Sequence, residues 1–193
     1  EKWLLHTWSL SVEWQFYLAY PLLLQALRWL RMSIPWALTA LLIGSFGIAV
    51  AMGRSHPDAA FFLLLPRAWE LLAGGLVFAS DAHVANLRRW PIGTLGAALI
   101  LLPALLPWAP PWPMAVMPAV AGAVLVLIAR RENSRVTGNR VVRAVGRWSY
   151  SIYLWHWPLI VLWPYAFGQV DPLPILVASL VLASATKVFV EDR

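Results

Sequence analysis

The sequence predicts an all-α protein, a polytopic bundle of transmembrane helices. Hydrophobic residues make up 61% of the 193 residues and charged residues only 12%, whereas about a quarter of the residues in a typical soluble domain are charged. The apolar residues come in runs of roughly twenty, the length that crosses the hydrocarbon core of a bilayer. Runs of this length are too long for barrel strands, so we expect helices to be the spanning elements.

Seven spans are expected along the chain. They cover about residues 8–28, 34–53, 60–80, 92–108, 113–129, 149–167 and 172–190. The fourth and fifth are the weakest, because their connection, LPALLPWAPPWPMAVMP, is rich in proline, which breaks or kinks helices. Without an internal repeat or a long linker, residues 1–193 are expected to form a single transmembrane domain.

The charges of the connecting segments alternate. Basic residues follow the first, third and fifth spans, whereas the other connections carry no basic excess. Positive charges gather on the cytoplasmic side of membrane proteins. The net charge of +6 is therefore read as a topology signal, and no nucleic-acid partner is expected. We expect a multi-pass protein of the bacterial inner membrane. The alternating charges predict that the chain enters the membrane at the outer face and ends inside.

The cysteine and histidine content limits the chemistry. The chain has no cysteine, which excludes a disulfide framework, a thiolate nucleophile and a Cys-ligated zinc within it. The four histidines are scattered and form no HExxH motif. No metal site is expected.

The first polar cluster inside a span is HTWSLSVEWQFY, residues 6–17. His6, Ser9 and Glu13 have the spacing i, i+3, i+7 and so share one helical face. Ionisable groups within a span are costly and usually mark a cavity or a pathway. The alternative is an ordinary helix start, with a serine cap and an acidic first turn that the helix dipole favours.

The second polar cluster is PRAWELLAGG, residues 66–75. Arg67 and Glu70 are three residues apart and are expected to pair. Pro66 frees the carbonyl of Phe62, and the two glycines at the end are expected to serve helix packing. The alternative is a self-neutralised pair buried between helices without a chemical role.

The third polar cluster is RWSYSIYLWHWPLIVLW, residues 147–163. Ser149, Tyr153 and His156 form a stripe with the spacing i, i+4, i+7. Pro158 is expected to kink the helix and to leave the carbonyl of Leu154 unpaired. A lone histidine on an apolar face can equally be structural.

An arginine-rich loop, residues 130–147, is expected before this span. Its guanidinium groups suit the phosphates of a nucleotide-bearing donor. The positive-inside rule explains the same charges without any ligand.

Three segments of the chain resemble the acyltransferase-3 family. HTWSLSVEWQFYLAYPLLL is similar to its WSLSVEEQFYLLWPLLL segment, SYSIYLWHWPLIVL to its C-terminal SYSLYLWHWPLLVL segment, and PRAWELLAGG to its tRaWELLaGallA helix. The closing FVEDR resembles the family's VE-P-R end without the proline. Trp14 stands where the family usually has a second Glu, so only Glu13 of that acidic pair is present.

The resemblance implies a ten-helix core, of which this chain is expected to contain about seven helices, with about three missing from its N-terminal side. It also implies an acyl-CoA donor, acetyl-CoA in particular, and no bound cofactor. The implied acceptor is a hydroxyl of a lipid-linked sugar, an O-antigen of lipopolysaccharide or another cell-envelope glycan. The family's proposed catalytic His and its Arg-x-x-Arg donor motif lie outside these residues; Arg28 and Arg31 have that spacing in another place.

The expected reaction is O-acylation, which needs a base for the hydroxyl proton and donors for the oxyanion. The expected catalytic residues are Glu13, Arg67 and His156, gathered around one wet cavity, and the expected substrate-binding residues are His6, Ser9, Ser11, Glu70, Ser149 and Tyr153. Membrane lipid, acyl-CoA and the glycan are the expected partners. The alternatives are a secondary transporter or flippase of envelope lipids or glycans, and a non-catalytic envelope-assembly protein with the same fold.

Overall fold

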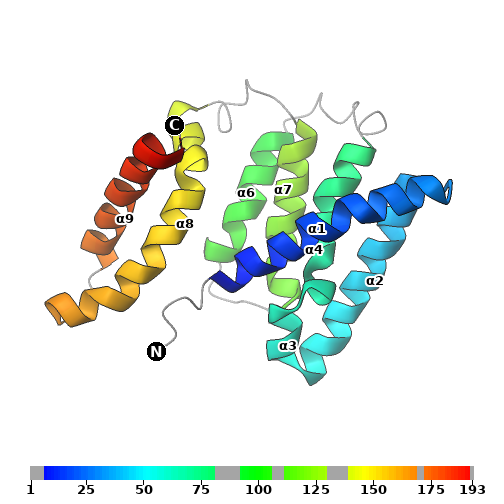
Figure 1. The fold of residues 1–193 in the computed structure, drawn as a ribbon, viewed down its shortest axis with the longest axis horizontal. Coiled ribbons are helices and arrows are strands. Elements are labelled where there is room, and N and C mark those ends of the chain that lie inside the picture. Colours follow the sequence, from blue (N-terminus) through cyan, green and yellow to red (C-terminus); the bar gives the residue numbers. More distant parts are fainter. Residues whose placement is uncertain (1–6, 81–91, 106–110, 130–138, 169–171, 192–193) are drawn as a thin grey trace. The chain divides into compact units, whose positions relative to one another are not determined.

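The computed structural model describes residues 7–80, 92–105, 111–129, 139–168 and 172–191. These residues form helices and turns without a strand (Figure 1), which confirms the all-α prediction. The chain divides into two compact units. Unit 1 consists of Glu1–Ser9 and Asn139–Arg193, and unit 2 of Leu10–Gly138. This division into units does not test the prediction of a single transmembrane domain.

Unit 2 contains most of α1 and the next six elements. They are α1 (Trp8–Trp29), α2 (Ile34–Ser55), α3 (Pro57–Phe62), α4 (Leu64–Ala79), α6 (Ile92–Leu105), the 3₁₀ helix η3 (Met114–Val116) and α7 (Met117–Ala129). Helix α4 contacts α2 and α7, and α7 contacts α6. Unit 2 is therefore a helical layer in which α4 holds a central place between neighbours on two sides.

Three described helical segments are long and apolar enough to cross a membrane. They are Ile34–Ser55, Pro57–Ala79 and Pro172–Val190. The apolar segments Ile92–Leu105 and Met114–Ala129 are shorter. Helices α1 and α8 (Arg140–Phe167) are long enough, but their polar residues lower their hydropathy. The count of seven spans stays a prediction.

The expected third span is broken within the membrane-length segment. Helix α3 ends at Phe62, Leu63 is extended with φ −88° and ψ 150°, and α4 begins at Leu64. The break places Pro66 in the first turn of α4, where its missing N–H costs nothing. The expected span over 60–80 lies within the membrane-length segment Pro57–Ala79. The helix is interrupted at Leu63, because in a continuous helix the proline ring would clash with the carbonyl of Phe62.

A buried serine joins α2 to α4 just after this break. The Ser45 hydroxyl donates to the carbonyl of Leu65 over 2.6 Å and accepts the N–H of Trp69 over 2.9 Å. Leu65 and Trp69 are the two residues that an i→i−4 bond joins in a regular helix. The Ser45 hydroxyl of α2 thus forms hydrogen bonds with the Leu65 carbonyl and the Trp69 N–H of α4.

Replacing this serine is expected to weaken the α2–α4 contact. Ser45→Ala should lower stability by about 1 kcal/mol, because the two hydrogen bonds that join α2 to the backbone of α4 are lost. This corresponds to a fall of roughly 2–4 °C in the unfolding midpoint of the protein in detergent. Ser55→Ala is the control, since the exposed Ser55 hydroxyl only bonds the Ala51 carbonyl of its own helix. Equal midpoints for the two variants would contradict the bridging role.

Glycines allow helices to approach closely at two places in unit 2. A Cβ on Gly96 of α6 would lie 2.6 Å from the carbonyl oxygen of Gly122, and a Cβ on Gly122 of α7 would lie 2.5 Å from that of Gly96. On α4, the Tyr20 side chain of α1 packs against Gly75 in the space that a Cβ would take, and Leu127 of α7 packs against Gly74. The expected packing role of the α4 glycine pair is confirmed.

Helix α8 of unit 1 begins earlier than the sequence predicted. It starts at Arg140 rather than at residue 149, because the Asn139 side chain accepts the N–H of Val141 over 2.8 Å and caps the helix. Its end is set by Gly168, which has φ 74°. The arginines of residues 140–147, expected in a loop, therefore form the first two turns of a 28-residue helix.

Unit 1 is completed by α9 (Pro172–Thr186) and the π-helical turn η4 (Lys187–Glu191). The face of α9 that is buried consists of Ile175, Ser179 and Ala183, and small residues such as these favour close packing against α8. The Trp155 indole of α8 donates to the Thr186 hydroxyl over 2.8 Å. Helix α8 changes direction in its C-terminal half (Figure 1), as Pro158 in its interior predicts.

Large apolar side chains cover much of the helical surface. Examples with more than half of the side chain exposed are Leu22, Trp36, Phe78, Leu101 and Val181. Faces of this kind mark contact with lipid or with another protein surface. The fold therefore leaves its apolar residues outside as well as inside, as expected for helices surrounded by hydrocarbon.

Candidate functional site

The second turn of α4 carries an ion pair. The Arg67 Nη2 donates to Glu70 Oε2 over 2.8 Å, and the two side chains are only 17% and 19% exposed. The spacing i, i+3 places both on one face of the helix. The predicted pairing is confirmed, and it lies in the first half of α4, directly after the break at Leu63.

An aromatic ring packs against the arginine. The Phe61 ring centroid of α3 lies 5.2 Å from Arg67 Cζ, a cation–π contact. Phe61 in turn meets the edge of Trp112 at 6.5 Å between ring centroids. The Trp112 carbonyl lies 3.1 Å from the position that a Cβ of Gly53 would take, so this tryptophan is seated against the end of α2. The break between α3 and α4 is what brings Phe61 over the guanidinium group.

One oxygen of the ion pair is left without a partner. Glu70 Oε1 is buried, and no residue in the described part of the chain donates a hydrogen bond to it. The Trp112 indole N–H is likewise buried without an acceptor among those residues. An unsatisfied buried polar group costs about 1–3 kcal/mol. Next to Arg67 the structure thus offers a buried acceptor, which suits a ligand with hydroxyl groups.

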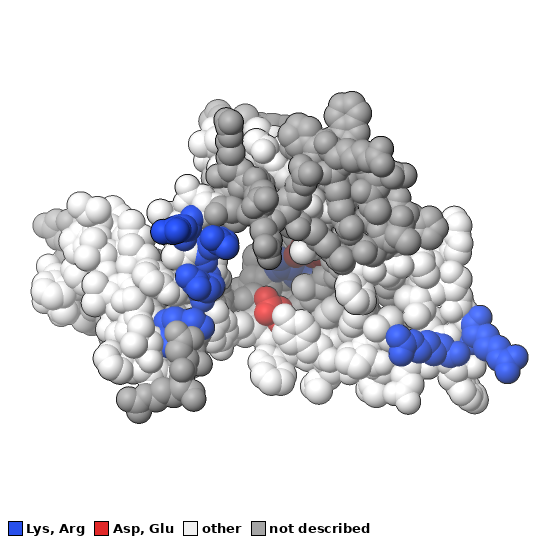
Figure 2. Space-filling view, turned by 90° about the horizontal axis from the view of Figure 1, so that it is seen from above, with Lys and Arg blue, Asp and Glu red and all other residues white. Residues whose placement is uncertain are grey.

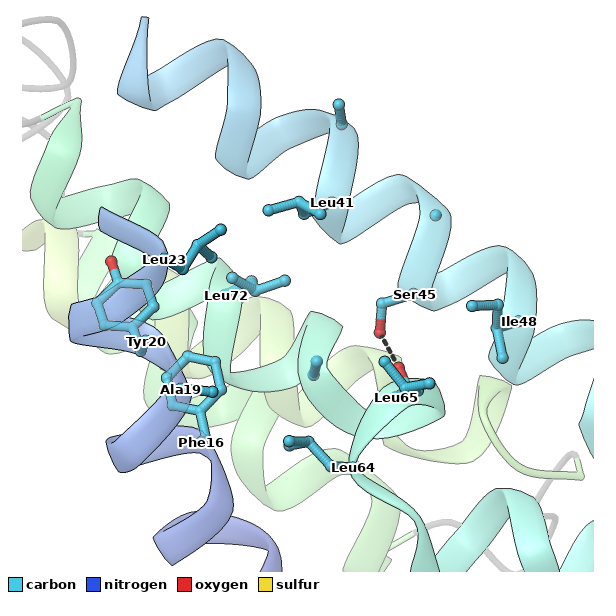
Figure 3. A pocket seen from close by; sticks show the side chains of 13 residues that line it. Phe16, Ala19, Tyr20, Leu23, Leu41, Ser45, Ile48, Leu64, Leu65 and Leu72 are labelled. Atoms are coloured by element: carbon cyan, nitrogen blue, oxygen red, sulfur yellow. Dashed lines mark hydrogen bonds between the residues drawn. The ribbon is translucent and has the colours of Figure 1, made fainter. Parts of the chain in front are cut away.

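The opposite side of α4 borders an apolar groove of about 400 Å³ (Figure 3). Side chains of α1, α2 and α4 line it: Phe16, Ala19, Tyr20, Leu23, Ala40, Leu41, Gly44, Ser45, Ile48, Leu64, Leu65, Ala68 and Leu72. The Ser45 hydroxyl is engaged with the Leu65 carbonyl (Figure 3). A sugar placed there would lose its hydrogen bonds, so the groove suits hydrocarbon.

The two faces of α4 are therefore chemically distinct. Leu65, Ala68 and Leu72 follow the spacing i, i+3, i+7 and face the groove. Arg67 and Glu70 lie on another side of the helix, because each residue turns by about 100°. Tyr20 packs on Gly75 and closes α1 against this helix.

Helix α1 holds the acidic residue predicted from its first turns. The Glu13 side chain is half-buried, and no described residue forms a hydrogen bond or an ion pair with it. Ser11 is exposed and accepts a hydrogen bond from Gln15 over 3.3 Å. His6 lies outside the described residues. Glu13 and the Arg67–Glu70 pair belong to the same unit.

The predicted stripe on α8 is organised around Tyr153. Its hydroxyl shares a 2.6 Å hydrogen bond with the Ser9 hydroxyl, which belongs to the same unit. His156 Nδ1 lies 2.7 Å from the Tyr153 carbonyl, and the two rings are 5.6 Å apart. Ser149 is exposed and donates to the Gly146 carbonyl of its own helix over 2.8 Å. The structure thus joins Ser9, Tyr153 and His156, but gives Ser149 a bond within α8.

The predicted candidates are distributed over both units. Arg67, Glu70 and Glu13 lie in unit 2, and Ser9, Tyr153 and His156 lie in unit 1. Their gathering around one cavity stays a prediction. The described residues contain no group of three His, Cys, Asp or Glu side chains that could hold a metal ion.

Sequence reasoning missed three contributors to this region. Phe61, Trp112 and Ser45 read as ordinary apolar or small residues of a span or a proline-rich connection. The break at Leu63 brings Phe61 to the ion pair, the approach to Gly53 places Trp112 beside Phe61, and the packing of α2 on α4 brings Ser45 to the groove. The proline in PRAWE was the one available signal, since a proline so close to a charged pair predicts irregular backbone there.

Comparison with known proteins decides the family. A family model described as an acyltransferase domain matches residues 1–189. The chain belongs to the acyltransferase-3 family. This match confirms the resemblance seen in the three sequence segments. The family and the apolar helices together indicate that this acyltransferase-3 chain is a membrane protein.

A curated relative agrees with the assignment. The acyltransferase-3 chain is 31% identical over 185 residues to a protein of Komagataeibacter xylinus named "Putative membrane-bound transacylase BcsY". The match covers 83% of this chain and 42% of the relative, so the chain spans less than half of that protein's length. No solved structure matches the chain significantly.

Proposed function

We propose that the protein is a membrane-embedded O-acyltransferase. It moves an acyl group, most simply acetyl, from acyl-CoA to a hydroxyl of a cell-envelope or lipid-linked sugar, such as an O-antigen, at the bacterial inner membrane. Membership of the acyltransferase-3 family and the similarity to a protein named as a transacylase support the acyl transfer.

One structural observation carries the proposal furthest. In unit 2 the half-buried Glu13 and the largely buried Glu70 both have carboxyl oxygens without a partner among the described residues. Carboxylates accept hydrogen bonds, and a sugar hydroxyl is a donor. Arg67 balances the charge of Glu70 and leaves its Oε1 able to accept. These two carboxyl groups offer hydrogen-bond acceptors to a hydroxyl-bearing substrate among otherwise apolar helices.

The proposed reaction is balanced by simple proton transfer. The hydroxyl oxygen attacks the thioester carbonyl, the C–O bond forms, and the hydroxyl proton passes to a general base. The tetrahedral intermediate then collapses, the C–S bond breaks, and CoA leaves as the thiol after taking up a proton. Donors near the carbonyl oxygen stabilise the intermediate. In this scheme Glu70 accepts from the acceptor sugar and Arg67 holds Glu70 in its rotamer.

The remaining predicted residues take supporting roles. Glu13 orients the acceptor hydroxyl or its base, and Ser11 offers a hydroxyl on the same helix. Tyr153 and His156, fixed to one another and to Ser9, line the path of the thioester. The apolar groove of unit 2 takes the hydrocarbon part of a lipid-linked acceptor or of a longer acyl chain, since its lining offers no hydrogen bonds to a sugar.

Glu13→Ala in the full-length protein is expected to reduce acyl transfer by about 100-fold or more, the range for a lost general acid–base or orienting group. Membrane abundance should stay unchanged, because no residue in the described part of the chain forms a hydrogen bond or an ion pair with Glu13. The measurement is the transfer of labelled acetyl from acetyl-CoA to membrane-extracted envelope glycans. Gln15→Ala is the matched control, two residues along the same helix and exposed.

Full activity of the Glu13→Ala protein would remove Glu13 from the site, and a second outcome would overturn the proposed function itself. Absence of acyl transfer in the wild-type protein, combined with counter-gradient uptake of a glycan lipid into proteoliposomes, would identify a transporter instead.

A further inference from the structure

The first two turns of α8 present a column of arginines. Arg140, Arg143 and Arg147 have the spacing i, i+3, i+7, which confines them to one side of the helix. All three are exposed, and with Gly146 they line an open hollow of about 680 Å³. Figure 2 shows basic side chains gathered in a row at this end of unit 1.

Among the described side chains of unit 1, this column has no acidic neighbour. The described side chains of unit 1 include the three arginines and Lys187, but no Asp or Glu. No ion pair is formed by these arginines within the described residues. Asn139 already occupies the first-turn N–H of Val141. An anion at this place is therefore held by the guanidinium groups, which bind phosphate in a bidentate manner.

The length of α8 separates a soluble phosphate ligand from a lipid headgroup. Its 28 residues span about 42 Å at 1.5 Å per residue. The hydrocarbon core takes about 20 residues, and the predicted span over 149–167 places the arginine turns of α8 outside it. The arginine turns then project about 10 Å further along the axis, whereas the interfacial layer on each side is only about 5–8 Å thick. Lipid phosphates lie at one depth, whereas the three arginines are spread over about 10 Å along the helix axis, so a single layer of headgroups does not match the whole column.

We propose that Arg140, Arg143 and Arg147 bind the nucleotide end of the acyl donor. A ligand with phosphates at separate positions, the 3′-phosphate and the 5′-diphosphate of CoA, matches a column of three guanidinium groups better than a single headgroup does. The inference rests on the proposed acyl-CoA-dependent function and names the part of the chain that recognises its donor. The arginines bind and do not take part in the chemistry.

The test uses the full-length protein in nanodiscs of phosphatidylcholine, which is neutral. The probe is adenosine 3′,5′-bisphosphate, and its Kd is measured by equilibrium dialysis. Arg140→Gln/Arg143→Gln is expected to raise the Kd at least tenfold, and to raise the KM for acetyl-CoA with little change in kcat. Arg28→Gln/Arg31→Gln is the matched control, with two exposed arginines at the same spacing in unit 2 and an expected change under twofold. Exposed Arg→Gln changes should leave folding intact, which a size-exclusion profile verifies.

Three results would overturn the inference. The first is an unchanged Kd in the α8 variant. The second is an equal loss in the Arg28/Arg31 control, which would indicate general charge attraction. The third is an effect that appears only in nanodiscs with phosphatidylglycerol, which would assign the column to a lipid headgroup. Failure of the proposed function looks different: the bisphosphate would bind through α8 although no acyl group is transferred from acetyl-CoA.

Discussion

Arg67→Ala is expected to remove acyl transfer and to destabilise the protein at the same time. The substitution leaves the Glu70 carboxylate largely buried without its 2.8 Å partner. Breaking a buried pair by removing one member costs about 3–5 kcal/mol. The unfolding midpoint of the purified protein in detergent and its abundance in membranes should both fall. A loss of activity in this variant alone would therefore not separate a chemical role from a structural one.

The double variant Arg67→Met/Glu70→Leu separates the two roles. Replacing a buried ion pair by apolar residues of similar size is often neutral or stabilising, so the midpoint should return to the wild-type value or above it. Acyl transfer should stay at least about 100-fold reduced, because the acceptor oxygen of Glu70 is gone. Transfer at the wild-type rate in a stable double variant would show that the pair serves packing alone.

Gly122→Ala is expected to separate α6 from α7. The new Cβ would lie 2.5 Å from the Gly96 carbonyl oxygen and 2.9 Å from the Ile100 nitrogen, both of which are backbone atoms that cannot rotate away. Overpacking of this kind costs about 1–3 kcal/mol, and Gly122→Leu should cost more. The thermal unfolding midpoint and the yield of membrane-inserted protein measure the effect.

Gly47→Ala provides the control for that change. Gly47 lies in α2, where a Cβ would meet nothing within 4 Å. Alanine is the better helix former, by about 0.5–1 kcal/mol, so this variant should be at least as stable as the wild type. A Gly122→Ala protein with the same midpoint as Gly47→Ala would contradict the close crossing of α6 and α7.

The positions of the helices followed from the apolar runs, but two boundaries did not. Helix α8 starts at Arg140 because the Asn139 side chain caps it. In the sequence, this capping asparagine cannot be told from any other polar residue before a basic segment. The expected third span divides at Leu63 because a proline three residues later finds a place in a new first turn. In both cases a local hydrogen-bonding or steric condition overrode the hydropathy pattern.

The candidate site shows the same division. The pairing of Arg67 with Glu70 was predictable, since their spacing on a helix leaves few alternatives in an apolar setting. The cation–π contact of Arg67 with Phe61 was not, because it depends on a break in the helix. The Ser45 bridge was also unpredictable from the sequence, since its partners lie 20 and 24 residues away.

The sequence by itself determined that this protein is helical, apolar and related to the acyltransferase-3 family, because periodicity, run length and motifs are local properties of the chain. The tertiary structure decided which polar atoms have partners: it left Glu70 Oε1 buried without one among the described residues, and it fixed Tyr153 to Ser9. The physical reason is that hydrogen bonding and burial depend on neighbours supplied by distant segments, which no local pattern contains.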